Sequence, residues 1–120
     1  MSDKFDIYDR ALKFAAKTAM FVDSLPFKQS AKEYGKQLIR SSASVGANLQ
    51  EADGAVSKKD FVNKMAIVRK EAKETYYWLT LIKETQLIES EKELMFLLSE
   101  SRELKLILSS IINKTKAKDT

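Results

Sequence analysis

The stretch that decides the fold is residues 57–82, which read SKKDFVNKMAIVRKEAKETYYWLTLI. At its start Ser57 lies three residues before Asp60, which is the spacing of a capping box at a helix N-terminus. Apolar or small residues then recur at alternating steps of three and four, the period of one face of an α-helix. This seam comprises Phe61, Met65, Val68, Ala72, Thr75, Leu79 and Ile82. The stretch therefore predicts a long amphipathic helix that buries one face.

Two further start signals of the same kind lie elsewhere in the chain, at Ser30 with Glu33 and at Ser90 with Glu93. Breaks separate the apolar stretches, because proline and the Asp-Gly pair do not continue a helix. The predicted helices span residues 4–24, 31–53, 58–85 and 91–114, with a frayed tail at 115–120. Since the connections are short, neighbouring helices are expected to run antiparallel. Residues 1–120 therefore predict a single all-α domain, an antiparallel up-down-up-down four-helix bundle.

Each of the other predicted helices carries an apolar seam with the same alternating steps. The seams are Phe5, Tyr8, Leu12, Ala15, Ala19 and Val22 in the first helix, Tyr34, Leu38, Ser42, Val45, Leu49 and Ala52 in the second, and Leu94, Leu97, Ser101, Leu104, Leu108 and Ile111 in the last. Four such seams are expected to form one core between helices that cross at about 20°.

Two groups of apolar residues lie outside these seams. Ile7, Phe14 and Phe21 recur every seven residues beside the first seam, and Leu106 and Ile107 add to the last helix. Contiguous exposed apolar surface usually marks an interface, so these five residues are predicted to make contacts between copies of the chain. The alternative is a core wide enough to absorb them.

The composition excludes most enzyme chemistry. The chain has no cysteine and no histidine, so thiol catalysis, cysteine-ligated metals and an imidazole base are excluded. Three glycines and one proline cannot form a glycine-rich phosphate loop. Glu71 and Glu74, with Glu51 on another helix, leave an all-carboxylate metal site as the enzymatic alternative, but nearby cations such as Arg40 are their expected partners. We therefore expect no enzyme activity and no cofactor.

Neither a secretion signal nor a membrane span is expected. The first residues, MSDKFDIYD, are acidic, and the longest purely apolar run is residues 94–98. A secretion signal has a basic segment before an apolar one, and a membrane helix needs about 18 apolar residues. The expected location is the cytoplasm, with no membrane contact.

The basic residues form two groups that are candidates for nucleic-acid binding. Lys32, Lys36 and Arg40 lie four residues apart on one helix face, and Lys58 and Lys59 open the next helix. These five residues are predicted to contact phosphates of RNA or DNA. The helix that Lys58 opens carries further cations at Lys64, Arg69, Lys70 and Lys73. The net charge of +4 permits a polyanionic partner without requiring one, so the alternative is an ordinary lysine-rich surface in water.

Base recognition is not expected from the aromatic residues. Tyr76, Tyr77 and Trp78 are consecutive, so on a helix they point in three directions and cannot form a row of stacking platforms. Any binding is expected to use the nucleic-acid backbone and to tolerate different base sequences. Tyr77 and Trp78 are expected to pack at contacts between subunits.

A polar stripe runs beside the apolar seam of the second helix. It consists of Gln37, Ser41, Ser44, Asn48 and Glu51, again at steps of four and three. A face that only meets water is typically rich in long lysine and glutamate side chains, whereas this stripe contains serine and asparagine. Its composition favours close polar contact with a neighbour, and the alternative is a solvated face.

The segment that contains this stripe resembles a known family. Residues 35–52 read GKQLIRSSASVGANLQEA, which resembles the signature of the 23S rRNA intervening-sequence protein family. The motif positions are Arg40, Ser44, Asn48 and Glu51. Residues 57–79 resemble the third helix of the family, and the similarity extends over about residues 5–90.

The resemblance implies a homopentamer in which five bundles close around a central channel. In some bacteria the gene of this family lies in an insertion within the 23S rRNA gene. A related barrel is the accessory protein of diversity-generating retroelements, which works with a reverse transcriptase and nucleic acid. The resemblance implies no enzyme activity.

Two functions follow from these observations. The first is an oligomeric bundle that binds RNA or DNA through a basic surface. The second is a structural or protein-interaction ring, in which the motif residues form a buried polar network. They are Arg40, Ser44, Asn48 and Glu51.

Overall fold

Four α-helices make up nearly all of the described chain. The computed structural model describes residues 3–89 and 91–118, with side chains from residue 7 onward. The helices are α1 (Asp3–Asp23), α2 (Gln29–Asp53), α3 (Lys58–Glu84) and α4 (Lys92–Ala117). Each helix begins and ends within three residues of the bounds that the sequence predicts.

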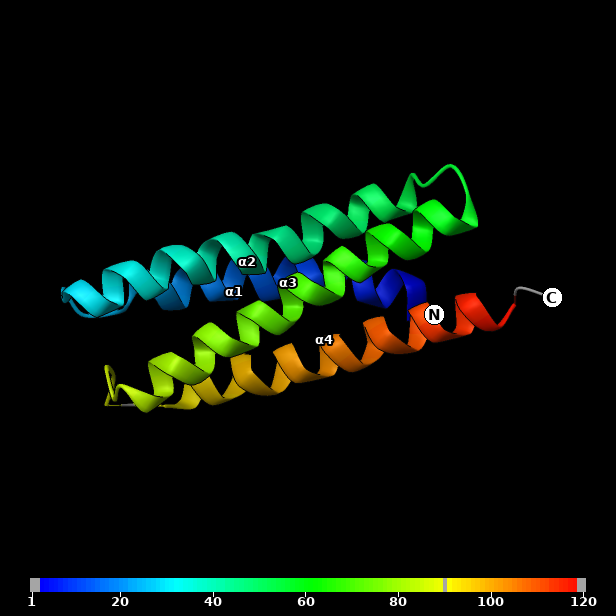
Figure 1. Ribbon diagram of the computed structural model, residues 1–120. Coiled ribbons are helices and arrows are strands. Elements are labelled where there is room, and N and C mark those ends of the chain that lie inside the picture. The colour runs from blue at the N-terminus through cyan, green and yellow to red at the C-terminus, as the bar shows by residue number, and fades with distance from the viewer. Residues whose placement is uncertain (1–2, 90, 119–120) are drawn as a thin grey trace.

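The helices run in alternating directions and pack side by side in chain order (Figure 1). α1 contacts α2, α2 contacts α3, α3 contacts α4, and α4 returns to contact α1, so the bundle closes on itself. The α1–α2 and α3–α4 connections lie at one end, and the α2–α3 connection lies at the other (Figure 1). The bundle measures 52 × 24 × 20 Å. The described chain is thus all-α, and no helix in it combines the length and the apolar character that a membrane crossing needs.

Of the three serines predicted to cap a helix, Ser57 does so in the structure. Ser57 Oγ accepts a hydrogen bond from the Asp60 backbone N–H at 3.0 Å, as a capping serine should. The expectation for Ser30 is wrong, because α2 begins earlier, with Lys28 at its N-cap position and no side-chain cap. Ser90 lies outside the described residues, and the N-cap position of α4 is Glu91.

The core is built from the predicted seams of α2, α3 and α4. Nearly every seam residue of these helices is buried, and Tyr34, Phe61 and Ile111 pack against the core while partly exposed. On α4 the core also takes in Leu98 and Ile112, which lie beside the predicted seam. These three helices therefore match the prediction that one apolar face of each is buried.

The prediction of which apolar stripe of α1 is buried is wrong. Ile7, Phe14 and Phe21 are only 2%, 2% and 6% exposed, so they belong to the core and cannot form a surface for another copy of the chain. Leu12, from the predicted seam, is 69% exposed instead. Both stripes of α1 have helical spacing, and the stripe with two phenylalanines buries more apolar area, which stabilises the fold more.

Two glycines of α2 face α1 at different distances. A Cβ atom added at Gly35 would lie 2.9 Å from Val22 Cγ1, which is closer than real Cβ contacts. A Cβ atom at Gly46 would lie 4.0 Å from Ala11 Cβ, an ordinary van der Waals distance. The close approach of the two helices therefore requires glycine at position 35 and permits alanine at position 46.

Candidate nucleic-acid interface

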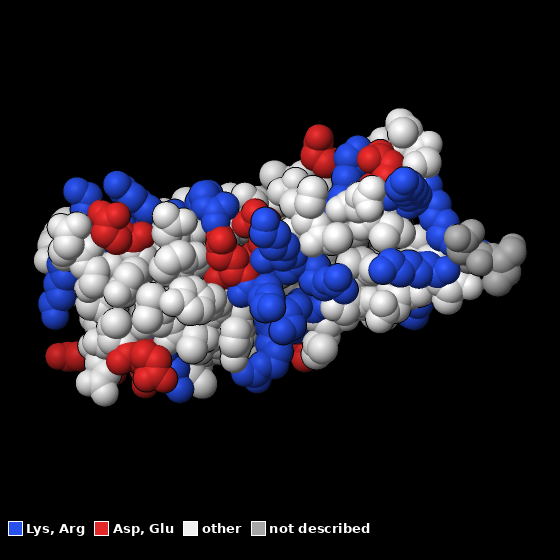
Figure 2. Space-filling view, in the orientation of Figure 1, with Lys and Arg blue, Asp and Glu red and all other residues white. Residues whose placement is uncertain are grey.

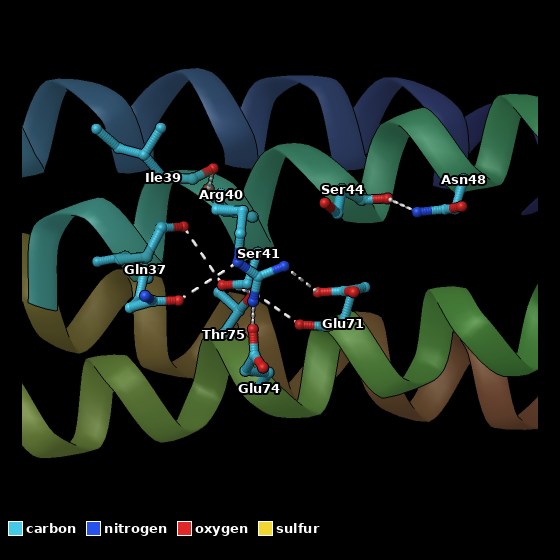
Figure 3. Close-up of polar contacts among 11 residues, drawn as sticks. Gln37, Ile39, Arg40, Ser41, Ser44, Asn48, Glu71, Glu74 and Thr75 are labelled. Carbon is cyan, nitrogen blue, oxygen red and sulfur yellow. Dashed lines mark hydrogen bonds and ion pairs between the residues drawn. The ribbon is translucent and has the colours of Figure 1, made fainter.

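An ion-paired cluster joins α2 to α3 near the middle of the bundle (Figure 3). From α2, Arg40 extends between two glutamates of α3 (Figure 3). Its Nη1 lies 3.3 Å from Glu71 Oε1, its Nη2 pairs with Glu74 Oε2, and its Nε donates to Gln37 Oε1 at 3.4 Å. The expected pairing of the glutamates with a nearby cation is confirmed. Because its charge is balanced within the subunit, Arg40 is a weaker phosphate contact than its exposure suggests.

Directly beneath this cluster, a buried polar contact joins the same two helices. The Thr75 hydroxyl donates to Ser41 Oγ at 2.9 Å, and its oxygen lies 2.8 Å from the backbone oxygen of Glu71. Both side chains are fully buried. Buried hydroxyl groups need such partners because an unpaired one destabilises the fold. The contact fixes how α2 and α3 align.

The four motif residues do not form a single buried network. The Arg40 side chain is 47% exposed and turns toward α3. Asn48 Nδ2 donates to the backbone oxygen of Ser44 at 2.9 Å, a contact within α2, and Glu51 is exposed. Within one subunit, successive motif residues along α2 turn toward different neighbours, and the network expected in an assembled ring stays a prediction.

The five predicted phosphate contacts lie in two separate places. Lys32 and Lys36 are exposed on the first turns of α2, whereas Lys58 and Lys59 begin α3 at the other end of the bundle. At 1.5 Å per residue, about 30 Å of helix separates the two groups. Lys59 is exposed, and Lys58 is partly buried. These residues do not form one patch on a single subunit.

A more concentrated basic site lies between α3 and α4. A surface hollow of about 400 Å³ is lined by Arg69, Lys70, Lys73 and Lys105, with Ala66 and Ser109. No lining residue is acidic. None of the four cations forms an ion pair within the described residues. Figure 2 shows basic side chains gathered near the middle of this face. We call this site the α3–α4 basic hollow.

The neighbouring pair Tyr76 and Arg102 reflects the same positive charge. Arg102 Nη2 donates to the Tyr76 hydroxyl oxygen at 2.7 Å. This hydrogen bond is the main cause that lowers the pKa of Tyr76, and the charge of Lys105 lowers it further. The phenolate form is favoured where positive potential is high. Lys105 of the hollow thus contributes to the positive charge beside Tyr76, although Arg102 contributes more.

The sequence indicates part of this hollow and misses part of it. Arg69, Lys70 and Lys73 belong to the basic run of the third helix, but Lys105 comes from the fourth helix. Only the packing of α3 on α4 brings Lys105 to the others. Its linear neighbours give no signal that it belongs to the same site.

The exposed apolar residues match the prediction on α4 at Leu106 and differ from it on α1. On α1, Leu12 and Met20 are largely exposed, and with Ala16 they follow one outer face at steps of four. On α4, Leu106 is 56% exposed and Ile107 is partly buried. A different surface from the Phe14 stripe is therefore available for contacts between copies.

The carboxylates do not assemble into a metal site. Within the described residues, no group of three or more acidic side chains is arranged to hold a metal ion. Glu71 and Glu74 are instead paired with Arg40.

These features define a class of protein: an all-α bundle whose second and third helices are joined by ion pairs and whose third and fourth helices carry a basic hollow. The family model for 23S rRNA-intervening sequence proteins matches residues 3–110, and the chain belongs to this family. The chain is also similar to a protein of unknown function from the S23 ribosomal protein family of Bacteroides thetaiotaomicron, known from a crystal structure. That similarity has a TM-score of 0.84 and 37% identity, and it covers 93% of this chain and 99% of that one. No curated protein matches the chain.

Proposed function

We propose that this protein is a non-enzymatic cytoplasmic bundle that binds RNA or DNA through the sugar–phosphate backbone, with the α3–α4 basic hollow as the contact surface. The observation that carries this proposal is the hollow itself, which is lined by four cations and by no acidic residue. Like charges three and four residues apart on a helix repel each other, by a few tenths of a kcal/mol per pair. Phosphates bound in the hollow would relieve this repulsion.

The proposal includes assembly into a ring, which the family resemblance implies has five copies. The exposed stripe of Leu12, Ala16 and Met20 on α1 and the exposed Leu106 on α4 are the apolar surfaces available for this contact. A ring would repeat the basic hollow around its axis. Repetition converts a modest local charge into a strong field for a polyanion.

The test is a binding titration by fluorescence anisotropy, using labelled structured RNA, duplex DNA and single strands from about 50 to 200 mM salt. The informative variant is Lys70→Gln with Lys73→Gln, which removes two charges of the hollow. Removing two phosphate contacts should reduce the slope of log affinity against log salt by about 1.5.

The matched control is Lys83→Gln with Lys92→Gln. These two exposed lysines lie beside the α3–α4 connection, so the control has the same change in net charge without touching the hollow. Equal weakening by both variants would mean that net charge alone drives binding. Absence of binding by the wild-type protein at the lowest salt would overturn the proposed function.

The groove between α1 and α2 favours a second candidate function, a protein-interaction scaffold. It has a volume of about 710 Å³, and its lining includes the apolar residues Val22 and Leu25, three lysines and one acid, Asp23. The lysines are Lys28, Lys32 and Lys36. An acidic segment with apolar side chains fits this chemistry. Lys32→Glu with Lys36→Glu should abolish capture of such a peptide and leave nucleic-acid binding by the α3–α4 basic hollow intact.

A further inference from the structure

The geometry points to single-stranded nucleic acid as the ligand of the α3–α4 basic hollow, with Tyr77 as the platform on which one base stacks; this inference rests on the proposed function. Tyr77 lies four residues after Lys73 on α3, so the two side chains are neighbours on one helix face. The rise of the helix between them is about 6 Å. One nucleotide of an extended strand spans this distance, so a phosphate at Lys73 leaves its base within reach of Tyr77.

Tyr77 has the properties of a stacking platform. Its side chain is 57% exposed, although tyrosine usually buries its ring. The ring meets Trp78 edge-on, with 5.2 Å between ring centroids and an angle of 76° between planes. Trp78 in turn packs against Tyr34 of α2 at 6.1 Å. These contacts hold the Tyr77 ring in place, so stacking a base on it costs less conformational entropy.

The shape of the basic hollow favours a single strand over a duplex. Arg69 and Lys105 are partly buried between α3 and α4, whereas Lys70 and Lys73 are exposed on the outer turns of α3. The bundle is only 20–24 Å across, and a straight duplex would touch its outermost side chains. A flexible strand can bend into the hollow and reach all four cations. In a duplex, moreover, the bases are paired and cannot stack on a side chain at the surface.

The consecutive aromatic residues are consistent with one platform rather than a row. Tyr76 is engaged by Arg102, and Trp78 is half-buried beside Tyr34. Only Tyr77 of the three is exposed. A single platform stacks any base, so binding should show little preference for base sequence.

The experiment compares three probes of equal length on the full chain: a labelled 20-nucleotide DNA strand of mixed sequence, a strand with abasic sites at every position, and the duplex of the first strand. For the wild-type protein we expect the intact strand to bind more tightly than both other probes. Tyr77→Ala should weaken binding of the intact strand by about 5- to 150-fold, the range measured for stacked bases. It should leave the abasic strand unchanged, and Tyr77→Phe should retain the wild-type preference.

The controls separate this inference from the proposed function. Phe27→Ala removes an exposed aromatic residue at the α1–α2 connection and should change none of the affinities. Lys73→Gln should weaken all three probes. If the wild-type protein binds the duplex or the abasic strand as tightly as the intact strand, or if Tyr77→Ala has no effect, the single-strand inference is overturned while backbone binding stands. If no probe binds, the proposed function fails.

Discussion

The two glycines of α2 provide a direct test of how closely α1 and α2 pack. Alanine is more favourable than glycine in a helix interior by about 1 kcal/mol, so both Gly35→Ala and Gly46→Ala gain this amount. At Gly46 the added methyl group lies 4.0 Å from Ala11 Cβ, and we expect the full gain in stability. At Gly35 it lies 2.9 Å from Val22 Cγ1, and valine has little freedom to move aside. Such overpacking costs about 1–3 kcal/mol.

Because the helix-propensity gain is common to both variants, their difference isolates the clash. Gly46→Ala should therefore be more stable than Gly35→Ala by about 1–3 kcal/mol. The measurement is urea unfolding followed by helical circular dichroism, with all proteins at one concentration, because the proposed assembly would make apparent stability concentration-dependent. Equal stabilities for the two variants would refute the close approach of α1 to Gly35. A Gly46→Ala variant less stable than the wild type would refute the open space assigned to that position.

Three further outcomes follow from the structure. Phe14→Ala should lower the free energy of unfolding by about 3–5 kcal/mol because its ring is in the core, whereas Leu12→Ala should change it little; thermal unfolding distinguishes them. Burial and the hydrogen bond to Asp53 raise the pKa of Tyr8 from 10.0 to about 12. Stability from this group is therefore present below pH 10 and lost as the pH rises toward 12, and Tyr8→Phe should flatten the unfolding profile above pH 10. Arg40→Gln should cost about 1 kcal/mol, since it leaves two glutamates of α3 without their cation, and should leave nucleic-acid affinity unchanged in the anisotropy titration.

The fold could be predicted where the sequence has one apolar stripe per helix. In α3 only one set of positions has apolar or small residues at helical spacing, and this set is buried from Met65 to Ile82. In α1 two stripes compete, and spacing alone does not choose between Leu12 and Phe14. The choice depends on the volume that the other three helices leave open, which is a property of the assembled core.

The candidate site was predictable only within single helices. The basic character of α3 at Lys70 and Lys73 is evident from their spacing, but Lys105 joins them through packing of α4. At Arg40 the sequence leaves two interpretations open, because its spacing with Lys32 and Lys36 predicts a phosphate contact. The sequence also predicts pairing of Arg40 with Glu71 and Glu74, and only the register between α2 and α3 shows that this pairing is formed.

The structure separates the family motif from the proposed binding surface. Arg40 and Ser41 face α3 and hold it through Glu71, Glu74 and Thr75. Arg69, Lys70 and Lys73 line the basic hollow from another side of α3, together with Lys105 of α4. The rotation of α3 about its own axis is set mainly by its buried seam from Met65 to Ile82, because a half-exposed ion pair contributes only about 1 kcal/mol. The family motif and the basic hollow are therefore separate features of the bundle, and Arg40, which is already paired with Glu71 and Glu74, contributes little positive charge to the surface.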